Sequence, residues 1–328
     1  YIGADDTTLD LFESQYQVPN GVSYNSYVIL DEKVAVMDTI DARKSDEWFA
    51  NLSDALGERT IDYIVISHLE PDHAANIKAV ADKYPAAKLV LSTKAKAMLP
   101  QFFTIDNLDE RCITVADGQE LSLGTHNLKF IMAPMVHWPE VMLEYETTEK
   151  VLFSADAFGK FGALSADDGT CEARRYYFNI VGKYGAPVQT LLKKAAGLDI
   201  KTICPLHGPI LKENLDFYIG KYLTWSSYEP EDDGVLVACA SIHGNTKAAA
   251  EKMVDILKEN GFAKVAFTDL TRDDMAEAIE DSFRYSRLIV AAASYDGGVF
   301  PPMEDFINRL SHKELLKMVH GHLLPASG

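Results

Sequence analysis

The sequence has little cysteine, and its few cysteines stand far apart. The four residues, Cys112, Cys171, Cys204 and Cys239, contain no C-x-x-C pair. This spacing excludes a disulfide framework and a cysteine-ligated zinc site. Unpaired thiols are typical of a reducing compartment, so we expect the protein to reside in the cytoplasm.

Long apolar runs and an excess of positive charge are also missing. No stretch of 18 apolar residues and no secretory signal is present, so we expect no membrane segment. The chain opens at Tyr1 without a methionine, and we expect its natural N-terminus to lie upstream. Asp and Glu exceed Lys and Arg by 49 to 31, which gives a net charge of −18. Such a charge repels phosphate backbones and anionic lipids, so neither nucleic acid nor membrane is an expected partner.

A length of 328 residues predicts two domains. The stretch YEPEDDG, residues 228–234, separates two regularly patterned regions, and we place the domains at 1–229 and 230–328. The first region alternates short β-rich runs, such as DYIVIS and KLVLS, with helical patterns, such as SDEWFANLSDAL and YYFNIVGKYGAPVQTLLKKA. This mixture predicts an α/β domain built in layers.

The second region alternates strictly between strand and helix. VLVACA, KVAFTDL and RLIVAAA read as strands, and TKAAAEKMVDILKENG and DDMAEAIEDSF read as helices. Strict alternation predicts right-handed βαβ units and a parallel sheet. Three strands are fewer than the five of a usual doubly wound sheet, although KMVHGHLLPASG at residues 317–328 could hold one more. We therefore expect this domain to be incomplete at its C-terminus.

Four apolar runs of the first region each end in a His or an Asp. IDYIVI leads to His68, LKFIMAPMV to His137, VLFSA to Asp156 and TICPL to His207. The stretch ISHLEPDHAAN adds Glu70, Asp72 and His73. A single His at a strand end is usually a hydrogen-bonded loop residue, and a single Asp usually caps a turn. Seven ligand-type residues at four strand ends, where functional side chains gather, predict a metal site instead.

Seven protein ligands suit two metal ions better than one. They exceed what one tetrahedral or octahedral ion with an open position would use. Four imidazoles and three carboxylates suit iron, manganese or zinc, and the share of carboxylates favours a harder ion. Asp156, which a strand of its own supplies, is well placed to bridge two ions.

At these residues the sequence resembles the flavodiiron proteins (A-type flavoproteins), and the resemblance extends to about Phe306. Hydrolases of the same fold usually read H-x-H-x-D-H, whereas Glu70 takes the middle His position here. The stretches HWPEVM, DAFG, YYFNI and LHGPIL also resemble segments of that family. The resemblance implies an αββα metallo-β-lactamase-like domain followed by a flavodoxin-like, doubly wound domain. It implies one iron held by His68, Glu70 and His137, a second held by Asp72, His73 and His207, and Asp156 bridging both. Trp138, next to His137, is expected to serve packing rather than chemistry.

The resemblance also implies an FMN site in the second domain. The first loop after a strand, S-I-H-G-N-T, is rich in small and hydroxyl residues at a helix start, which suits a phosphate. Its implied phosphate contacts are Ser241, His243, Gly244, Asn245 and Thr246, of which His243 could equally be a bystander. The stretch ASYDGGVFPPMEDF resembles the family's second FMN loop, with Ala293 in place of a usual proline. Its matching residues are Ser294, Tyr295, Asp296, Gly297 and Gly298. The third flavin loop has no counterpart beyond the final PASG, which resembles its downstream end.

The function implied by this resemblance is reduction of O2 to water, of NO to N2O, or both, at a diiron site that FMN supplies with electrons. The donor would be a separate rubredoxin-like or flavin reductase protein, and the assembly a head-to-tail homodimer or a tetramer. Two alternatives stay open. One is a dizinc hydrolase of the same fold, and the other is an FMN electron carrier or redox sensor without turnover.

Overall fold

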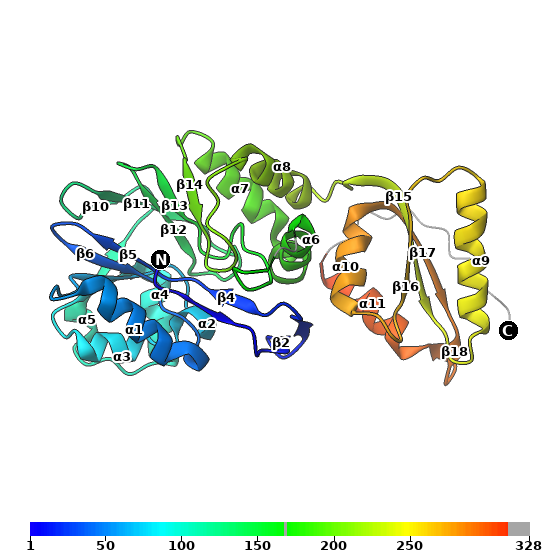
Figure 1. Cartoon of the computed structure of the whole chain (residues 1–328), viewed down its shortest axis with the longest axis horizontal. Coiled ribbons are helices and arrows are strands. Elements are labelled where there is room, and N and C mark those ends of the chain that lie inside the picture. The colour runs from blue at the N-terminus through cyan, green and yellow to red at the C-terminus, as the bar shows by residue number, and fades with distance from the viewer. Residues whose placement is uncertain (167–168, 314–328) are drawn as a thin grey trace. The chain divides into compact units, whose positions relative to one another are not determined.

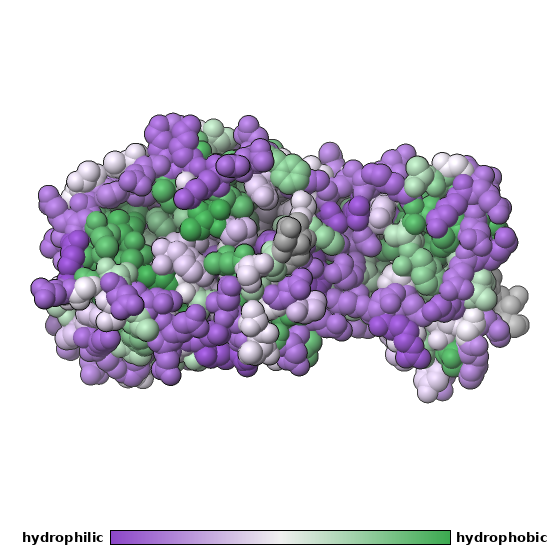
Figure 2. All heavy atoms as spheres, viewed as in Figure 1, coloured by the Kyte–Doolittle hydropathy of each residue, from purple (hydrophilic) through white to green (hydrophobic). Residues whose placement is uncertain are grey.

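The computed structural model describes residues 1–166 and 169–313, which form two compact units. The first unit comprises Tyr1–Ala173 and Ala186–Tyr222, and the second comprises Arg174–Gly185 and the chain from Leu223 onward. In the described ranges, no helix has both the length and the apolar composition that a bilayer crossing requires. Mainly hydrophilic residues cover the visible face, and hydrophobic residues show there as separate patches (Figure 2).

Two five-stranded sheets form the first unit (Figure 1). The first sheet has the order β5 (Tyr27–Leu30), β6 (Val34–Met37), β7 (Tyr63–Ile66), β8 (Lys88–Ser92) and β9 (Cys112–Val115). The second has the order β10 (Glu120–Ser122), β11 (Asn127–Met132), β12 (Met142–Glu146), β13 (Val151–Phe153) and β14 (Thr202–Cys204). In the first sheet β6 pairs with β7, β7 with β8 and β8 with β9, all in parallel, and in the second sheet β13 pairs with β14 in parallel. The carboxyl ends of β7, β13 and β14 are therefore free to present loops with functional residues.

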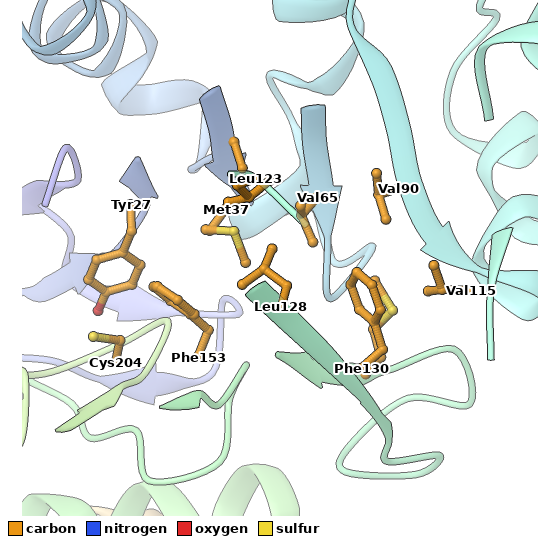
Figure 3. Close-up of a cluster of buried hydrophobic side chains, with 12 residues drawn as sticks. Tyr27, Met37, Val65, Val90, Val115, Leu123, Leu128, Phe130, Phe153 and Cys204 are labelled. Atoms are coloured by element: carbon orange, nitrogen blue, oxygen red, sulfur yellow. The ribbon is translucent and has the colours of Figure 1, made fainter. Parts of the chain in front are cut away.

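The apolar faces of the two sheets pack against each other and form the main core (Figure 3). Met37, Val65 and Val90 come from the first sheet, and Leu128 and Phe130 come from the second. All five are at most 1% exposed. Because neighbouring positions of a strand point to opposite faces, these residues alternate with residues that face the helices outside. This packing fixes the strand ends of the first sheet relative to those of the second sheet.

Helices and short strands complete the first unit. The longest helix of its first half, α1, buries Trp48, Leu52 and Leu56, a spacing of four that gives one apolar stripe. Helix α1 spans Ser45–Leu56, and the other elements of this kind are α2 (Pro71–Ala74), α3 (Ile77–Lys83), α4 (Thr93–Met98), α5 (Leu108–Arg111) and α7 (Gly185–Ala195), with 3₁₀ turns η1 (Ala42–Lys44) and η2 (Leu99–Gln101). Helices α6 (Gly169–Tyr176) and α8 (Leu215–Ser226) begin in the first unit and end in the second. Near the N-terminus, β1 (Ala4–Asp6) pairs with β4 (Val22–Tyr24), and β2 (Leu11–Phe12) pairs with β3 (Tyr16–Gln17).

A parallel three-stranded sheet organises the second unit. Its order is β16 (Val265–Asp269), β15 (Asp232–Ala240) and β17 (Tyr285–Ala292). Helix α9 (Asn245–Glu259) covers one face, and α10 (Met275–Arg284) and α11 (Pro301–His312) cover the other (Figure 1). A hairpin of β18 (Ser294–Tyr295) and β19 (Gly298–Val299) follows β17. These elements confirm the expected fold class, while the stretch 317–328 lies outside the described residues.

One predicted helical stretch is confirmed but is not a single regular helix. The pattern YYFNIVGKYGAPVQTLLKKA spans residues 176–195. In the structure it contains the end of α6, a π-helical turn η3 (Tyr177–Val181), a 3₁₀ turn η4 (Gly182–Tyr184) and then α7. The hydroxyl of Tyr228 donates to the carbonyl of Gly182 and accepts from the amide of Gly185, at 2.9 and 3.2 Å. These bonds offer the backbone partners outside the helical ladder, which accounts for the break.

Candidate metal centre

The seven predicted metal ligands lie close together at strand ends of the first unit. His68 follows β7 and Glu70 precedes α2, which itself carries Asp72 and His73. His137 stands in the loop from β11 to β12, Asp156 follows β13 and His207 follows β14. Their ligand atoms form two groups, each with its atoms within 4.8 Å of one another: His68, Glu70, His137 and Asp156, and Asp72, His73 and His207.

Asp156 faces both groups, one oxygen to each. Its Oδ2 lies 3.3 Å from Nε2 of His68 and 3.3 Å from Nε2 of His137. Its Oδ1 lies 3.2 Å from Nε2 of His73 and 3.8 Å from Nε2 of His207. A carboxylate whose two oxygens point at two sets of imidazoles has the arrangement that a bridging ligand needs.

A second carboxylate completes each group. Oε2 of Glu70 lies 3.3 Å from Nε2 of His68 and 3.0 Å from Nε2 of His137. Oδ2 of Asp72 lies 3.3 Å from Nε2 of His73 and 3.1 Å from Nε2 of His207. The side chains of Glu70 and Asp72 keep 17% and 12% exposure, so the centre opens to solvent on their side.

Buried polar atoms without a partner test whether these residues fit a metal. Among the described residues, both ring nitrogens of His73, Nε2 of His137 and Oδ1 of Asp72 are buried and make no hydrogen bond. Leaving such groups unsatisfied is costly, whereas coordinating a cation satisfies them. Two imidazoles and two carboxylates of one group, and two imidazoles with a carboxylate of the other, are donor sets that iron, manganese and zinc accept. The residues therefore fit two divalent ions.

Neighbouring groups orient the imidazoles. Nδ1 of His68 lies 2.8 Å from Oε1 of Glu140, and Nδ1 of His207 lies 2.7 Å from the carbonyl of Ser23. An acceptor at Nδ1 keeps the proton on that nitrogen and turns the Nε2 lone pair toward the centre. Asn25 supports the same loop as His207, since its Nδ2 donates to the carbonyls of Pro205 and Gly208 at 2.8 and 2.7 Å.

Hydrogen bonds between the groups of the centre shift several pKa values. Burial lowers the pKa of His68, but its contacts with Glu140 and Glu70 outweigh that effect and hold the pKa well above its usual value. Burial raises the pKa of Asp156, but the nearby imidazoles of His73 and His137 outweigh that effect and hold the pKa well below its usual range. Asp156 is therefore ionised, which is the form that binds a metal.

Trp138 and Phe12 pack on the imidazoles from two sides. The Trp138 ring meets His68 edge-on with centroids 5.2 Å apart, and it also stacks on Phe102 at 6.3 Å. Phe12 meets His207 edge-on at 5.3 Å. Both contacts hold imidazole planes in place, and the contact of Trp138 agrees with its expected packing role.

A buried carboxyl pair lies behind the loop of His68, and the sequence did not point to it. Asp38 and Glu144 are 3% and 0% exposed. Ser67 joins them, because its amide donates to Oδ1 of Asp38 at 2.8 Å and its hydroxyl donates to Oε2 of Glu144 at 2.9 Å. Burial, together with the charge of Asp38, raises the pKa of Glu144 well above its usual value, and burial raises that of Asp38 to about 6. Burial therefore favours the neutral, protonated form of Glu144.

This pair predicts a dependence of stability on pH. In the unfolded chain Glu144 loses its proton above its ordinary pKa, whereas in the folded protein its pKa is raised and it keeps the proton. The free energy of unfolding therefore falls as pH rises from the ordinary pKa toward the raised pKa of the folded protein. Glu144→Gln imitates the protonated acid. We expect the variant to gain about 1 kcal/mol or more over the parent at pH 8 and little at pH 5. Urea unfolding at both pH values measures this, with the exposed Glu58→Gln as control. An equal loss at both values would contradict the prediction.

The ten predicted flavin-binding residues lie in two loops of the second unit. Ser241–Thr246 joins β15 to α9, and the amide of Gly244 donates to Oγ of Ser241 at 3.0 Å. Ser294–Gly298 forms the β18–β19 hairpin, with Asp296 and Gly297 at its turn. Because β15 and β17 pair in parallel, with Ala240 opposite Ala292, both loops leave the same edge of the sheet. The stretch PASG lies outside the described residues.

Known proteins resemble this chain over most of its length. Residues 22–208 match the ODP family beta lactamase model. The chain is 31% identical to an uncharacterized protein of Methanocaldococcus jannaschii, over 94% of this chain and 78% of that protein. It is 26% identical to the anaerobic nitric oxide reductase flavorubredoxin of Vibrio vulnificus over 92% of this chain, but it spans only 63% of that protein.

Solved structures resemble the fold of the whole chain. The flavodiiron protein of Giardia intestinalis matches with a TM-score of 0.90 and 26% identity, over 96% of this chain and 78% of that chain. The rubredoxin oxygen:oxidoreductase of Desulfovibrio gigas matches with a TM-score of 0.87 and 27% identity, over 96% and 80%. Both structures extend over the two units described above.

Proposed function

The chain belongs to the flavodiiron protein family of oxidoreductases, and on that premise we propose that it reduces O2 to water, NO to N2O, or both, at a non-haem diiron centre supplied with electrons through FMN. The observation that carries this proposal is the position of Asp156, whose two oxygens face two separate groups of imidazoles and carboxylates. The Vibrio vulnificus relative is named a nitric oxide reductase and the Desulfovibrio gigas structure an oxygen oxidoreductase, which supports both substrates.

The proposed ligands fall into two groups, one for each iron. His68, Glu70 and His137 would hold one iron, Asp72, His73 and His207 the other, and Asp156 would bridge them. When bound, the two irons would supply open coordination positions and redox chemistry for a diatomic oxidant. The chain's own part is to hold the ligands: Glu140 and the carbonyl of Ser23 keep the imidazoles in one tautomer.

A pocket of about 340 Å³ gives access to this centre. Its walls include Glu70 and Asp72, the ring of Tyr24 and the side chain of Arg43. Small neutral molecules such as O2 and NO need no charged contact to enter, and the four acidic residues that line the pocket, Glu13, Asp41, Glu70 and Asp72, disfavour anionic substrates. This charge also disfavours the anionic substrates that many hydrolases of the fold cleave.

The second unit would hold FMN at the edge where two strands end. Ser241, His243, Gly244, Asn245 and Thr246 are proposed to bind its phosphate at the start of α9. The β18–β19 hairpin, with Ser294, Tyr295, Asp296, Gly297 and Gly298, is proposed to contact the ring. Tyr295 is 49% exposed, so its face is available for stacking.

The partners proposed for this reaction are a separate rubredoxin-like or flavin reductase donor and a second copy of the chain. A head-to-tail homodimer or a tetramer would bring each flavin to the irons of another copy. Cys112, Cys204 and Cys239 form no disulfide, which agrees with the proposed location in a reducing cytoplasm.

Metal content and turnover test the proposal together. The protein is purified from iron-supplemented cells, loaded with FMN, and assayed for iron, zinc and flavin per chain. We expect close to two irons, and consumption of O2 or NO once the flavin is reduced anaerobically. Hydrolytic activity with two zinc ions that ferrous reconstitution cannot replace would support the dizinc hydrolase. Reducible flavin without consumption of either gas would support the electron carrier.

A further inference from the structure

The loop that carries Asp156 has a strained backbone on both sides of this residue. Ala155 has a φ of 48° and Phe158 a φ of 67°. Neither residue is a glycine, and residues with a Cβ atom rarely adopt positive φ. Such a conformation persists only where surrounding contacts determine it, and it is frequent at sites whose geometry serves function. The contacts that hold this loop therefore also set the direction in which Asp156 points.

Backbone hydrogen bonds hold the two ends of this loop. Near its start, the carbonyl of Ala155 accepts from the amide of Leu206 at 2.9 Å. Near its end, the amide of Gly162 donates to the carbonyl of Gly21 at 3.1 Å. Leu206 directly precedes His207, so the first of these bonds joins the loop of Asp156 to the loop of another metal ligand. Asp156 itself lies between the two bonds.

A side chain from α8 holds the middle of the loop. The hydroxyl of Tyr222 accepts a hydrogen bond from the amide of Phe158 at 2.5 Å. The rings of these two residues also stack, with their centroids 4.2 Å apart and their planes at 30°. Both side chains are buried and both belong to the first unit, so water does not compete for the bond. Breaking it would leave a buried amide without its acceptor, which is costly.

Packing alone does not require a tyrosine at position 222. A phenylalanine there would fill the same space and stack on Phe158 in the same way. The hydroxyl is the difference between the two side chains, and burying a hydroxyl without a partner is unfavourable. Its partner here is the amide of the left-handed residue two positions after Asp156. The hydroxyl thus acts on the strained part of the backbone.

We propose that Tyr222 is a positioning residue, which holds the backbone of Phe158 so that Asp156 presents one oxygen to each metal ion. The inference rests on the proposed function, because Asp156 can bridge only where two ions bind. Oδ2 of Asp156 lies 3.3 Å from Nε2 of His68, and Oδ1 lies 3.2 Å from Nε2 of His73. A rotation of this one carboxylate moves both oxygens, so loss of the tyrosine hydroxyl weakens the binding of both ions together.

Tyr222→Phe tests this role, because it removes the hydroxyl and keeps the ring. Metal-free parent and variant are titrated anaerobically with Fe²⁺ in competition with a chelator. We expect the affinity for both ions to fall about 10- to 100-fold, as it does when residues that support metal ligands are changed. Electron paramagnetic resonance of the Mn²⁺-loaded proteins adds a signature of the bridge, since a coupled pair of ions differs from isolated ions. We expect a coupled pair in the parent and weaker coupling in Tyr222→Phe.

Tyr145→Phe is the matched control. Tyr145 is a buried tyrosine of β12 whose hydroxyl donates to the carbonyl of Asp199 at 2.8 Å, and Asp199 belongs to no loop of the metal centre. We expect both variants to lower the melting temperature of the metal-free protein by similar amounts. Only Tyr222→Phe should change the metal affinity and the Mn²⁺ signal.

Three outcomes decide against the inference. Parental metal affinity and coupling in Tyr222→Phe, with a lowered melting temperature, would show that the hydroxyl only stabilises the fold. Weakened binding of one ion alone would show that it does not act through the bridging carboxylate. Both results would leave the proposed function intact. A parent protein that binds fewer than two ions of either metal would overturn the inference and the proposed function together.

Discussion

Replacing Asp156 with alanine is expected to remove both metal ions at once. One carboxylate faces two groups of imidazoles, Oδ2 toward His68 and His137, and Oδ1 toward His73 and His207. Removing it takes one ligand from each ion and also the negative charge that keeps two cations close together. We expect the affinity for each ion to fall on the order of a hundredfold or more, because even residues that only support ligands cost 10- to 100-fold when changed.

Asp72→Ala is the matched control for this experiment. Asp72 contacts His73 and His207 at 3.3 and 3.1 Å and belongs to one group only. We expect this variant to lose mainly the ion of that group and to keep the other. Iron per chain after dialysis, and the fraction released at increasing chelator concentration, measure both variants. Retention of one tightly bound iron in Asp156→Ala would show that Asp156 does not bridge.

The strands that carry the metal centre could be predicted because two signals coincide in them. Each is a short apolar run of a buried strand, and each ends at a residue whose side chain binds metals. The structure joins these runs in two sheets whose strand ends bring His68, His137, Asp156 and His207 together. The alternation of the second region likewise predicted its parallel sheet. The local sequence pattern was sufficient here because the buried strand and the residue that could bind a metal belong to the same short segment of the chain.

Residues whose role depends on packing between distant segments could not be predicted. Glu144 belongs to the run MLEYE, where nothing marks one glutamate as fully buried. Its environment arises only when β12 packs near Asp38, more than a hundred residues earlier. Glu140 did have a signal, because it lies three residues after His137 in HWPEVM.

Glu140 supports one metal group alone, and its replacement should therefore affect one ion alone. Its Oε1 accepts from Nδ1 of His68 at 2.8 Å and from the amide of Leu69 at 3.0 Å. Both bonds hold the loop that presents His68, and the negative charge makes the imidazole a stronger ligand. Glu140→Ala removes both bonds in a buried place and frees the ring to turn. We expect the affinity for the ion of His68, Glu70 and His137 to fall about 10- to 100-fold.

Glu140→Gln separates the effect of the hydrogen bonds that Glu140 accepts from the effect of its negative charge. Oε2 of Glu140 is buried and makes no hydrogen bond to the described residues, so an amide nitrogen can take its place while Oε1 keeps both bonds. We expect the glutamine variant to retain most of the affinity that alanine loses, because the position of His68 is preserved. Chelator competition resolves the two ions as fast and slow fractions: the fast fraction should grow in Glu140→Ala, to about half of the iron, and stay small in Glu140→Gln. Equal release of both ions in Glu140→Ala would mean that this carboxylate supports the fold of the whole centre and not the orientation of one imidazole.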